Sequence, residues 1–325
     1  MGQADFQRSF FKRIITHQLS GIILALVLIS AAAWWWSEYF LTEYNIIIII
    51  RTLAFVGIVA IGQSMLLILG ELDLSLGAIA GLCGVIGGIL MVDVGLNPFL
   101  SFGLGLLLGA FCGLINGLFV TQIRLNSLVV TLGMSGVYKG INLVITKGKA
   151  IVNIPQEIHF LGKENLWGVL PVPFVILFVV LAIIAFIAAF TMFGRYMYAI
   201  GNNLEAASIL GIRVNRIRTV CFIIAGFLGA LAGMLMVARL GSSQPSIGEV
   251  WVMPSIAAPV IGGVHTTGGV GSPVGAVIGA LVIGVIENII VLFGVSPYWQ
   301  NVVSGVIVVA AISLDSLSRR YLKKD

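Results

Sequence analysis

Charged residues are scarce in this sequence. Of its 325 residues, 10% are charged and 59% are hydrophobic, whereas charged residues make up about 25% of an ordinary soluble domain. A soluble core of this size could not cover so apolar a composition with a polar surface. The chain must therefore use lipid as its solvent, where only helices or a closed barrel satisfy every backbone polar group.

Cysteine and histidine are also few, with three of each. Cys83, Cys112 and Cys221 lie inside apolar runs, where a free cysteine behaves as a small hydrophobic side chain. The histidines show no spacing typical of a metal site. We therefore expect neither disulfides nor a metal ion, and no cofactor bound by this chain.

Motifs for nucleotide hydrolysis are missing. The two Gly-Lys pairs, Gly148-Lys149 and Gly162-Lys163, are followed by alanine and glutamate, so no phosphate-binding loop is present. The sequence predicts a chain that is not an enzyme, so active transport would draw on an ion gradient or another polypeptide. The net charge of +5 is localised and indicates membrane orientation rather than nucleic-acid binding.

Long apolar runs are abundant, and lengths of about 20 residues favour helices over the shorter, alternating strands of a barrel. We predict an all-α membrane protein in which residues 1–325 form a single transmembrane domain of about ten segments. The segments are expected at 19–36, 46–69, 74–92, 98–121, 125–146, 170–193, 219–240, 252–264, 269–293 and 297–314. The eighth is too short to cross about 30 Å. Trp34–Trp36 favour an interfacial anchor over a cleaved signal peptide ending at Ala31–Ala33.

The basic residues predict the orientation. If both termini are cytoplasmic, twelve Lys and Arg residues lie inside and four outside, as the positive-inside rule expects. The inside set is Arg8, Lys12, Arg13, Arg124, Arg195, Arg213, Arg216, Arg218, Arg319, Arg320, Lys323 and Lys324. Arg51 and Lys139 fall within spans, and both are expected to extend toward a membrane surface.

The two halves of the chain, about 19–146 and about 170–314, would each hold five segments in opposite orientation. An inverted repeat is therefore predicted as a hypothesis, with a broken element in each half, at 70–76 and at 252–271. Paired broken segments indicate a pathway near the middle of the membrane. Many of the forty glycines recur at helical spacing, which predicts closely packed helices.

Polar residues within the apolar runs are candidates for the pathway. Glu71, Asp73 and Ser75 lie at the first break. Asp73 and Ser75 either cap the third segment and line the pathway, or belong to a solvated turn at the cytoplasmic surface; both interpretations stay open. Gln63, Asn116, Glu287 and Asn288 are isolated polar residues, for which hydrogen bonds between helices are favoured over substrate contacts.

The segment 194–218 is the longest polar interruption with a helical motif. Asn202 and Asn203 are predicted to cap a short helix with Glu205 in its first turn, and Gly211 to end it. Ala206, Ala207, Ile209 and Leu210 give an apolar face, and Arg195, Arg213, Arg216 and Arg218 flank it. We expect a docking element for a cytoplasmic partner; the alternative is a helix lying on the lipid surface.

Three stretches of the sequence resemble a known family: ELDLSLGAIAGL, YAIGNNLEAASILGI and GALVIGVIENIIVLFGVSPYWQNVVSGVIVVAAISLD. Together with the order of the spans, they resemble the permease subunit of sugar ATP-binding cassette (ABC) importers of the ribose, galactose, xylose and autoinducer type, over about residues 20–318. The motif E-A-A-x-x-x-G implies a coupling helix that docks on the ATP-hydrolysing subunit. The residues so implicated are Asn202, Asn203, Glu205, Ala206, Ala207, Gly211 and Arg213.

The resemblance also implies partners and cargo. They are an ATP-binding cassette subunit that holds ATP and Mg²⁺, a periplasmic sugar-binding protein and a second permease copy or a paralogue. The location implied is a bacterial inner membrane, and the cargo a monosaccharide or related small polyol or furanose. The sequence departs from the family pattern at Glu71, at Met253-Pro254-Ser255 and at His265. The candidate pathway or gate residues are Glu71, Asp73, Ser75, Pro254, Ser255, His265 and Asn288.

Two other functions fit parts of the pattern. A secondary transporter could move protons through Glu71, Asp73 and Glu287 without a partner. A membrane scaffold or receptor would account for the spans, but not for the broken elements or the loop motif.

Overall fold

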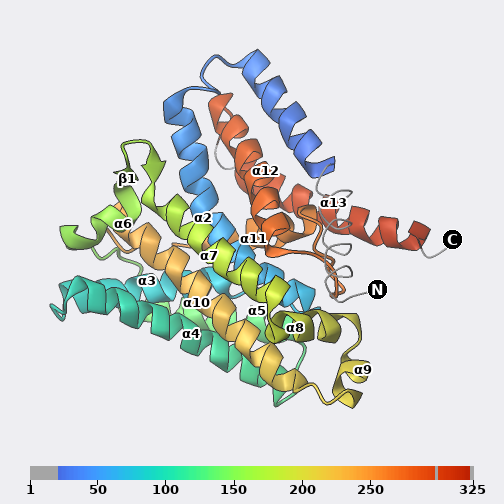
Figure 1. Ribbon diagram of the computed structural model, residues 1–325. Helices are drawn as coiled ribbons and strands as arrows, with labels where there is room; N and C mark the ends of the chain where they lie inside the picture. Colours follow the sequence, from blue (N-terminus) through green and yellow to red (C-terminus); the bar gives the residue numbers. More distant parts are fainter. Residues whose placement is uncertain (1–20, 297–298, 323–325) are drawn as a thin grey trace.

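The computed structural model describes residues 21–296 and 299–322, which are mostly helical (Figure 1). The amino-terminal segment expected in the cytoplasm and the start of the first span lie outside this range. Among the basic residues used for the orientation, Arg8, Lys12, Arg13, Lys323 and Lys324 are outside the described residues. The side chains of Arg319 and Arg320 are likewise not described.

Six helices are long and apolar enough to cross a membrane, and three shorter apolar helices accompany them within the described ranges. The six are α2 (Glu43–Ile68), α4 (Pro98–Thr121), α5 (Ser127–Thr146), α7 (Val172–Phe190), α10 (Val214–Leu240) and α12 (Pro273–Leu292). The shorter ones are Gly21–Trp36, α3 (Leu76–Val92) and the run Glu249–Ile261, which comprises η2 (Glu249–Trp251) and α11 (Val252–Ile261). The prediction of an all-α membrane protein is confirmed in this coarse form.

The remaining elements lie between the spans and at the carboxyl end. They are η1 (Gln156–Ile158), α6 (His159–Lys163), the two-residue strands β1 (Asn165–Leu166) and β2 (Leu170–Pro171), α8 (Met192–Asn202), α9 (Leu204–Ile209) and α13 (Trp299–Leu322). The strands pair in antiparallel fashion, with Asn165 opposite Pro171 and Leu166 opposite Leu170.

Short polar caps set the helix starts. The side chains of Thr42, Asn97, Asn126 and Ser272 each accept a hydrogen bond from a backbone N–H in the first turn of α2, α4, α5 and α12. Proline at the first helical position of α4 and α12 has no N–H to leave unpaired. These caps explain why four starts fall within a few residues of the apolar boundaries in the sequence.

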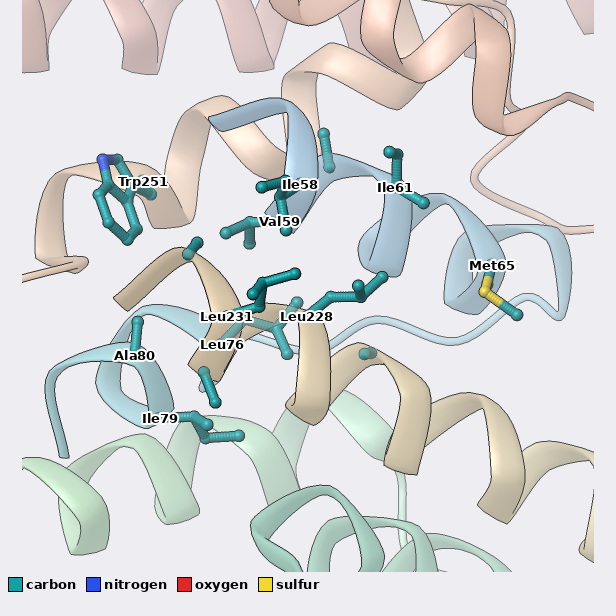
Figure 2. Close-up of a cluster of buried hydrophobic side chains, with 14 of the residues drawn as sticks. Ile58, Val59, Ile61, Met65, Leu76, Ile79, Ala80, Leu228, Leu231 and Trp251 are labelled. Atoms are coloured by element: carbon teal, nitrogen blue, oxygen red, sulfur yellow. The ribbon is translucent and has the colours of Figure 1, made fainter. Parts of the chain in front are cut away.

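Helix α10 forms the centre of the bundle and packs against α4, α2 and α3, while α2 packs against α12, α11 and α7. Figure 2 shows the buried cluster where these helices meet, with Ile58 and Ile61 from α2, Leu76 from α3 and Leu228 from α10. Trp251 closes one end of it and stacks on Phe55 with ring centroids 5.9 Å apart.

Glycine allows α4 and α10 to approach closely. A Cβ added at Gly226 would lie 2.3 Å from the Gly109 carbonyl oxygen, and one added at Gly113 would lie 2.2 Å from the Phe222 carbonyl oxygen. No side chain fits at such distances, so this crossing depends on glycine. The predicted close packing is confirmed for this helix pair.

The chain is broken in both halves. Residues 69–75 separate α2 from α3, and 241–251 separate α10 from α11. The second break passes alongside α3: a Cβ added at Gly81 would lie 2.8 Å from the Ile247 carbonyl oxygen, and one at Gly77 would lie 2.3 Å from that of Gly248. The predicted second break, 252–271, is confirmed in part: 262–271 are irregular, 252–261 form the short helix α11, and further irregular backbone precedes it.

The two cations expected within spans, Arg51 and Lys139, bind protein groups. The Arg51 guanidinium donates to the Lys163 carbonyl (3.0 Å) and to Asn165 Oδ1 (2.8 Å). Lys139 Nζ lies 2.6 Å from Glu249 Oε1. These partners belong to segments between the expected spans, 147–169 and 241–251, and are not apparent from local sequence.

Candidate functional site

The segment 194–218 is mostly helical. Residues up to Asn202 belong to α8, which starts after Thr191, whose side chain accepts from the Gly194 N–H. Asn203 then caps α9, because its Oδ1 accepts from the Ala206 N–H at 2.9 Å. The prediction that Asn202 also caps α9 is wrong. Asn202 ends α8, and its Nδ2 donates to the Tyr198 carbonyl at 2.9 Å.

Helix α9 ends at a left-handed glycine. Gly211 has φ of +79°, its N–H donates to the Ser208 carbonyl (3.0 Å), and the Ile212 N–H donates to the Ala207 carbonyl (3.1 Å). These two bonds form a Schellman motif. A Cβ at Gly211 would meet nothing within 4 Å, so the backbone conformation alone favours glycine there.

The surface of α9 is unusually apolar for an exposed element. Ala207 faces inward, whereas Ile209 and Leu210 are 86% and 78% exposed. Figure 1 shows α9 at the edge of the molecule, beyond the ends of α8 and α10. Glu205 lies exposed in its first turn, where the positive end of the helix favours a carboxylate.

Two hollows flank α9. One, of about 860 Å³, lies between the end of α4, α9 and the start of α10, and four of its lining residues are basic: Arg124, Arg213, Arg216 and Arg218. The other, of about 580 Å³, is lined by Phe193, Tyr196 and Leu210, among others. Arg213 is exposed at the N-cap position of α10. A partner protein could therefore contact α9 on both sides. The four arginines line the larger of the two hollows.

Helix α8 connects α9 to the interior. Tyr198 Oη donates to the Gly271 carbonyl at 2.8 Å, and burial raises the pKa of the Tyr198 hydroxyl to about 12, so it remains a donor. A Cβ added at Gly201 would lie 1.9 Å from the Ile68 carbonyl oxygen, which itself accepts from the Gly269 N–H. The loop 262–272, which contains His265, thus packs between α8 and the end of α2.

The first break is built around a buried carboxylate. Asp73 is 1% exposed, and its Oδ1 accepts from the Ser75 N–H (2.7 Å) and Oγ (2.6 Å). Asn116 Nδ2 donates to Asp73 Oδ2 (3.2 Å) and to Ser75 Oγ (2.8 Å). The solvated-turn interpretation is therefore wrong for Asp73. Ser75 holds the N-cap position of α3 but makes no side-chain capping bond to that helix.

Side chains from two helices satisfy the irregular backbone of this break. The Gln63 amide of α2, oriented to match its partners, donates to the Asp73 carbonyl (3.1 Å) and accepts from the Asp73 N–H (3.2 Å). Ser127 Oγ and Thr131 Oγ1 of α5 accept from the N–H groups of Leu72 and Leu74. Non-helical backbone at membrane depth requires such partners, so these residues fix the shape of the break.

Glu71 forms an ion pair with Arg218, with side chains 11% and 15% exposed. Arg218 belongs to α10, so the pair joins the break of the first half to a helix of the second. Glu71, where the sequence departs from the family pattern, is therefore paired with a basic residue of the second half.

A third cavity, of about 630 Å³, lies between α2, α11, α12 and α13; we call it the α2–α12 cavity. Its lining includes Asn45, Trp251, Pro254, Glu287, Asn288 and Ser304. The Asn45 and Asn288 amides exchange two hydrogen bonds (3.0 and 2.8 Å), and Ser304 Oγ donates to Glu287 Oε1 at 3.2 Å. The preference for interhelical bonds is confirmed at Asn116, Glu287 and Asn288, whereas Gln63 bonds to the backbone of the first break.

The predicted gate residues do not form one cluster. Pro254 and Asn288 line the α2–α12 cavity, whereas Ser255 Oγ bonds to the Val252 carbonyl of its own helix at 2.9 Å and is not part of that lining. His265 belongs to the loop against α8. Within residues 21–296 and 299–322, no three His, Cys, Asp or Glu side chains gather as metal ligands.

Comparison with known proteins identifies the family of this chain. Residues 45–312 match the family described as branched-chain amino acid transport system, permease component. The chain belongs to this permease family. Ribose import permease protein RbsC of Bacillus subtilis is 36% identical to it over 96% of this chain and 97% of its own length. Autoinducer 2 import system permease protein LsrC of Photorhabdus luminescens is 32% identical over 94% and 92%, and RbsC of Haemophilus influenzae 33% over 94% of each chain.

The permease is therefore a transport subunit in a membrane rather than an enzyme. Two features of its sites could not be found by inspecting the sequence. Asn45, the partner of Asn288, is 243 positions away from it and follows a polar loop. Arg124 was counted only as an orientation signal, although it lines the hollow beside α9.

Replacing the buried carboxylate tests the role of the first break. We expect Asp73→Ala to destabilise the permease by about 2–4 kcal/mol, because the Ser75 and Asn116 donors would lose a charged acceptor in a buried site. The melting temperature in detergent should fall by roughly 3–6 °C. Asp93→Ala, at an exposed position after α3, is the matched control and should leave it unchanged.

Proposed function

We propose that this chain is the membrane-spanning subunit of an ATP-driven ABC importer, through which a monosaccharide or related small polyol or furanose crosses the membrane. The observation that carries the proposal is α9: a short capped helix between spans with two large apolar side chains exposed at its end. A helix stabilised at both ends yet apolar on its outside suits a docking element.

The cargo class rests on the relatives. The family description names branched-chain amino acids, whereas the relatives that match over nearly their whole length are named for ribose and autoinducer 2. Family membership alone is compatible with different cargoes, and the full-length likeness favours the sugar-type cargo. An external, periplasmic binding protein would deliver it.

In this proposal α9 is the coupling helix. Asn203 and Gly211 hold it in place, Asn202 ends the helix that supports it, and the docking surface is formed or flanked by Glu205, Ala206, Ala207 and Arg213. The partner ATPase would bind ATP and Mg²⁺, and its closure would push α9. Through Tyr198 and Gly201 of α8, that movement would reach the loop 262–272 and both breaks.

The finer architecture is also part of the proposal: ten segments in a single domain, arranged as an inverted repeat. The packing supports it, because neighbours in one half have counterparts in the other. Helix α10 packs on α4 and α3 as α2 packs on α12 and α11, and α3 packs on α5 as α11 packs on α13. Both termini would be cytoplasmic in a bacterial inner membrane, with a second copy or a paralogue completing the pathway.

The pathway would pass the broken elements. We assign Glu71, Asp73 and Ser75 to holding the first break, Pro254 and Asn288 to the wall of the α2–α12 cavity, and Ser255 and His265 to the segments that move beside it. Displacement of α11 and the loop 262–272 relative to α3 would open the pathway alternately to the two sides of the membrane.

Transport by proteoliposomes tests the function. The permease, with the ATPase and the binding protein of the same system, should accumulate labelled ribose or another sugar held by that binding protein only when ATP is supplied. Glu205→Lys should abolish uptake and the stimulation of ATP hydrolysis by the binding protein. Uptake driven by a pH gradient without ATP would instead favour the secondary transporter.

A further inference from the structure

An ion pair lies inside a candidate membrane span. Lys139 Nζ of α5 is 2.6 Å from Oε1 of Glu249, the first residue of η2. Helix α5 has 20 residues and the composition of a membrane span. At 1.5 Å per residue, Lys139 lies about 4 Å from the midpoint of the helix, so the pair lies near the middle of this candidate span.

Both side chains are accessible despite this depth, with 53% of Lys139 and 44% of Glu249 exposed. Charges at this depth are costly when they face lipid, and they normally face a cavity, water or a partner. The contact at 2.6 Å also holds the lysine away from the headgroup region, where an unpaired lysine would extend. The surface around the pair is therefore not a lipid-facing surface.

The surroundings of the pair combine bare backbone and polar groups with apolar side chains. Gly136 and Gly140 lie on either side of Lys139, and a Cβ added at either would meet nothing within 4 Å. Gln244 and Ser246 of the neighbouring segment are exposed. Large apolar side chains are exposed there as well, among them Val137 (48%) and Ile141 (44%) of α5. Bare backbone and polar groups therefore form part of the exposed surface beside the pair.

The pair also joins the two halves of the chain. Glu249 lies just before α11, and Lys139 belongs to α5 of the first half. One turn further along α5, Asn142 Nδ2 donates to the Pro245 carbonyl at 3.0 Å. A displacement of α11 during transport would therefore change the distance between Lys139 and Glu249.

We propose that Lys139 and Glu249 line the water-filled translocation pathway and form a binding subsite for the hydroxyl groups of a neutral polyol. The ammonium donates and the carboxylate accepts, as a hydroxyl requires. Because the two charges cancel, the subsite favours neither anionic nor cationic cargo. This inference rests on the proposed function, since it assigns part of the pathway of that transporter.

Cysteine labelling tests access to the pair without requiring transport. Lys139→Cys and Glu249→Cys should each react in native membranes with a membrane-impermeant thiosulfonate reagent. Ile183→Cys, exposed near the middle of α7, is the matched control and should remain unlabelled. The native residues Cys83, Cys112 and Cys221 are buried, so background labelling is low.

Uptake by charge variants tests the subsite in the assembled importer. Lys139→Gln and Glu249→Gln should each raise the KM for sugar about tenfold, as expected for one charged hydrogen bond. The double variant Lys139→Glu/Glu249→Lys should recover most of that loss, because it restores one donor and one acceptor at the same place.

Two results would overturn the inference. One is the absence of labelling at both introduced cysteines, and the other is an unchanged KM for sugar in both glutamine variants. A wild-type complex without ATP-dependent uptake would refute the proposed function instead, while the labelling would still decide access.

Discussion

Replacing Ile209 and Leu210 together with aspartate should abolish uptake and separate the permease from its ATPase. Both side chains are largely exposed, so the change removes little from the core of the permease itself. Each contributes about 1.5–3 kcal/mol when fully buried against a partner, and a loss of that size from both corresponds to a roughly 100-fold or greater loss of affinity. Copurification of the tagged permease with the ATPase subunit, followed by uptake, measures the effect.

Two controls separate docking from folding in this experiment. Val94→Asp introduces the same charge at an exposed apolar position between α3 and α4, away from α9, and should leave the complex intact. Ile209→Met with Leu210→Met keeps the apolar surface and should preserve most of the uptake. Normal copurification of the aspartate variant would show that this end of α9 is not the docking surface.

Removing Arg218 should have the second large effect, this time on stability. Arg218→Ala leaves the Glu71 carboxylate buried without its cation, which typically costs about 3–5 kcal/mol. We expect the melting temperature of the purified permease to fall by roughly 4–7 °C and uptake to fall with it. Arg216→Ala, an exposed position two residues earlier, is the control.

The double variant Glu71→Gln/Arg218→Met makes this prediction specific to the pair. It removes both charges while keeping side-chain volume, so the melting temperature should recover most of the loss seen in Arg218→Ala. If the single and double variants were equally unstable, the cost would come from lost packing of Arg218 rather than from an unpaired carboxylate.

Local signals in the sequence were sufficient for much of the fold. An asparagine shortly before an acidic residue favours a helix start, and a glycine after a short apolar run favours a helix end. Both signals lie among near neighbours in the chain, which is why the cap at Asn203 and the end at Gly211 could be predicted. Apolar length identified the spans for the same reason. A predicted span end differs from the observed helix end where a side chain starts a new helix within an apolar run. Thr191, for example, caps α8 directly after the end of α7.

Contacts between distant segments could not be predicted in this way. Whether Asp73 was solvated or buried depended on Asn116 and Ser75 meeting around it, and the position of Lys139 depended on Glu249 in a segment of the other half. A single sequence gives no distances between such residues. The gate candidates were therefore grouped by chain position, whereas the fold distributes Pro254, Ser255 and His265 among different surroundings.

The central claim is that α9 meets the ATPase on the cytoplasmic side, and the variant Ile209→Cys tests it most directly. The account predicts that a maleimide reaches the introduced thiol in inside-out vesicles but not in right-side-out vesicles, and that bound ATPase protects it. A bifunctional reagent should also join this thiol to the ATPase subunit. Labelling from the outside alone, or equal labelling with and without the ATPase, would contradict the account.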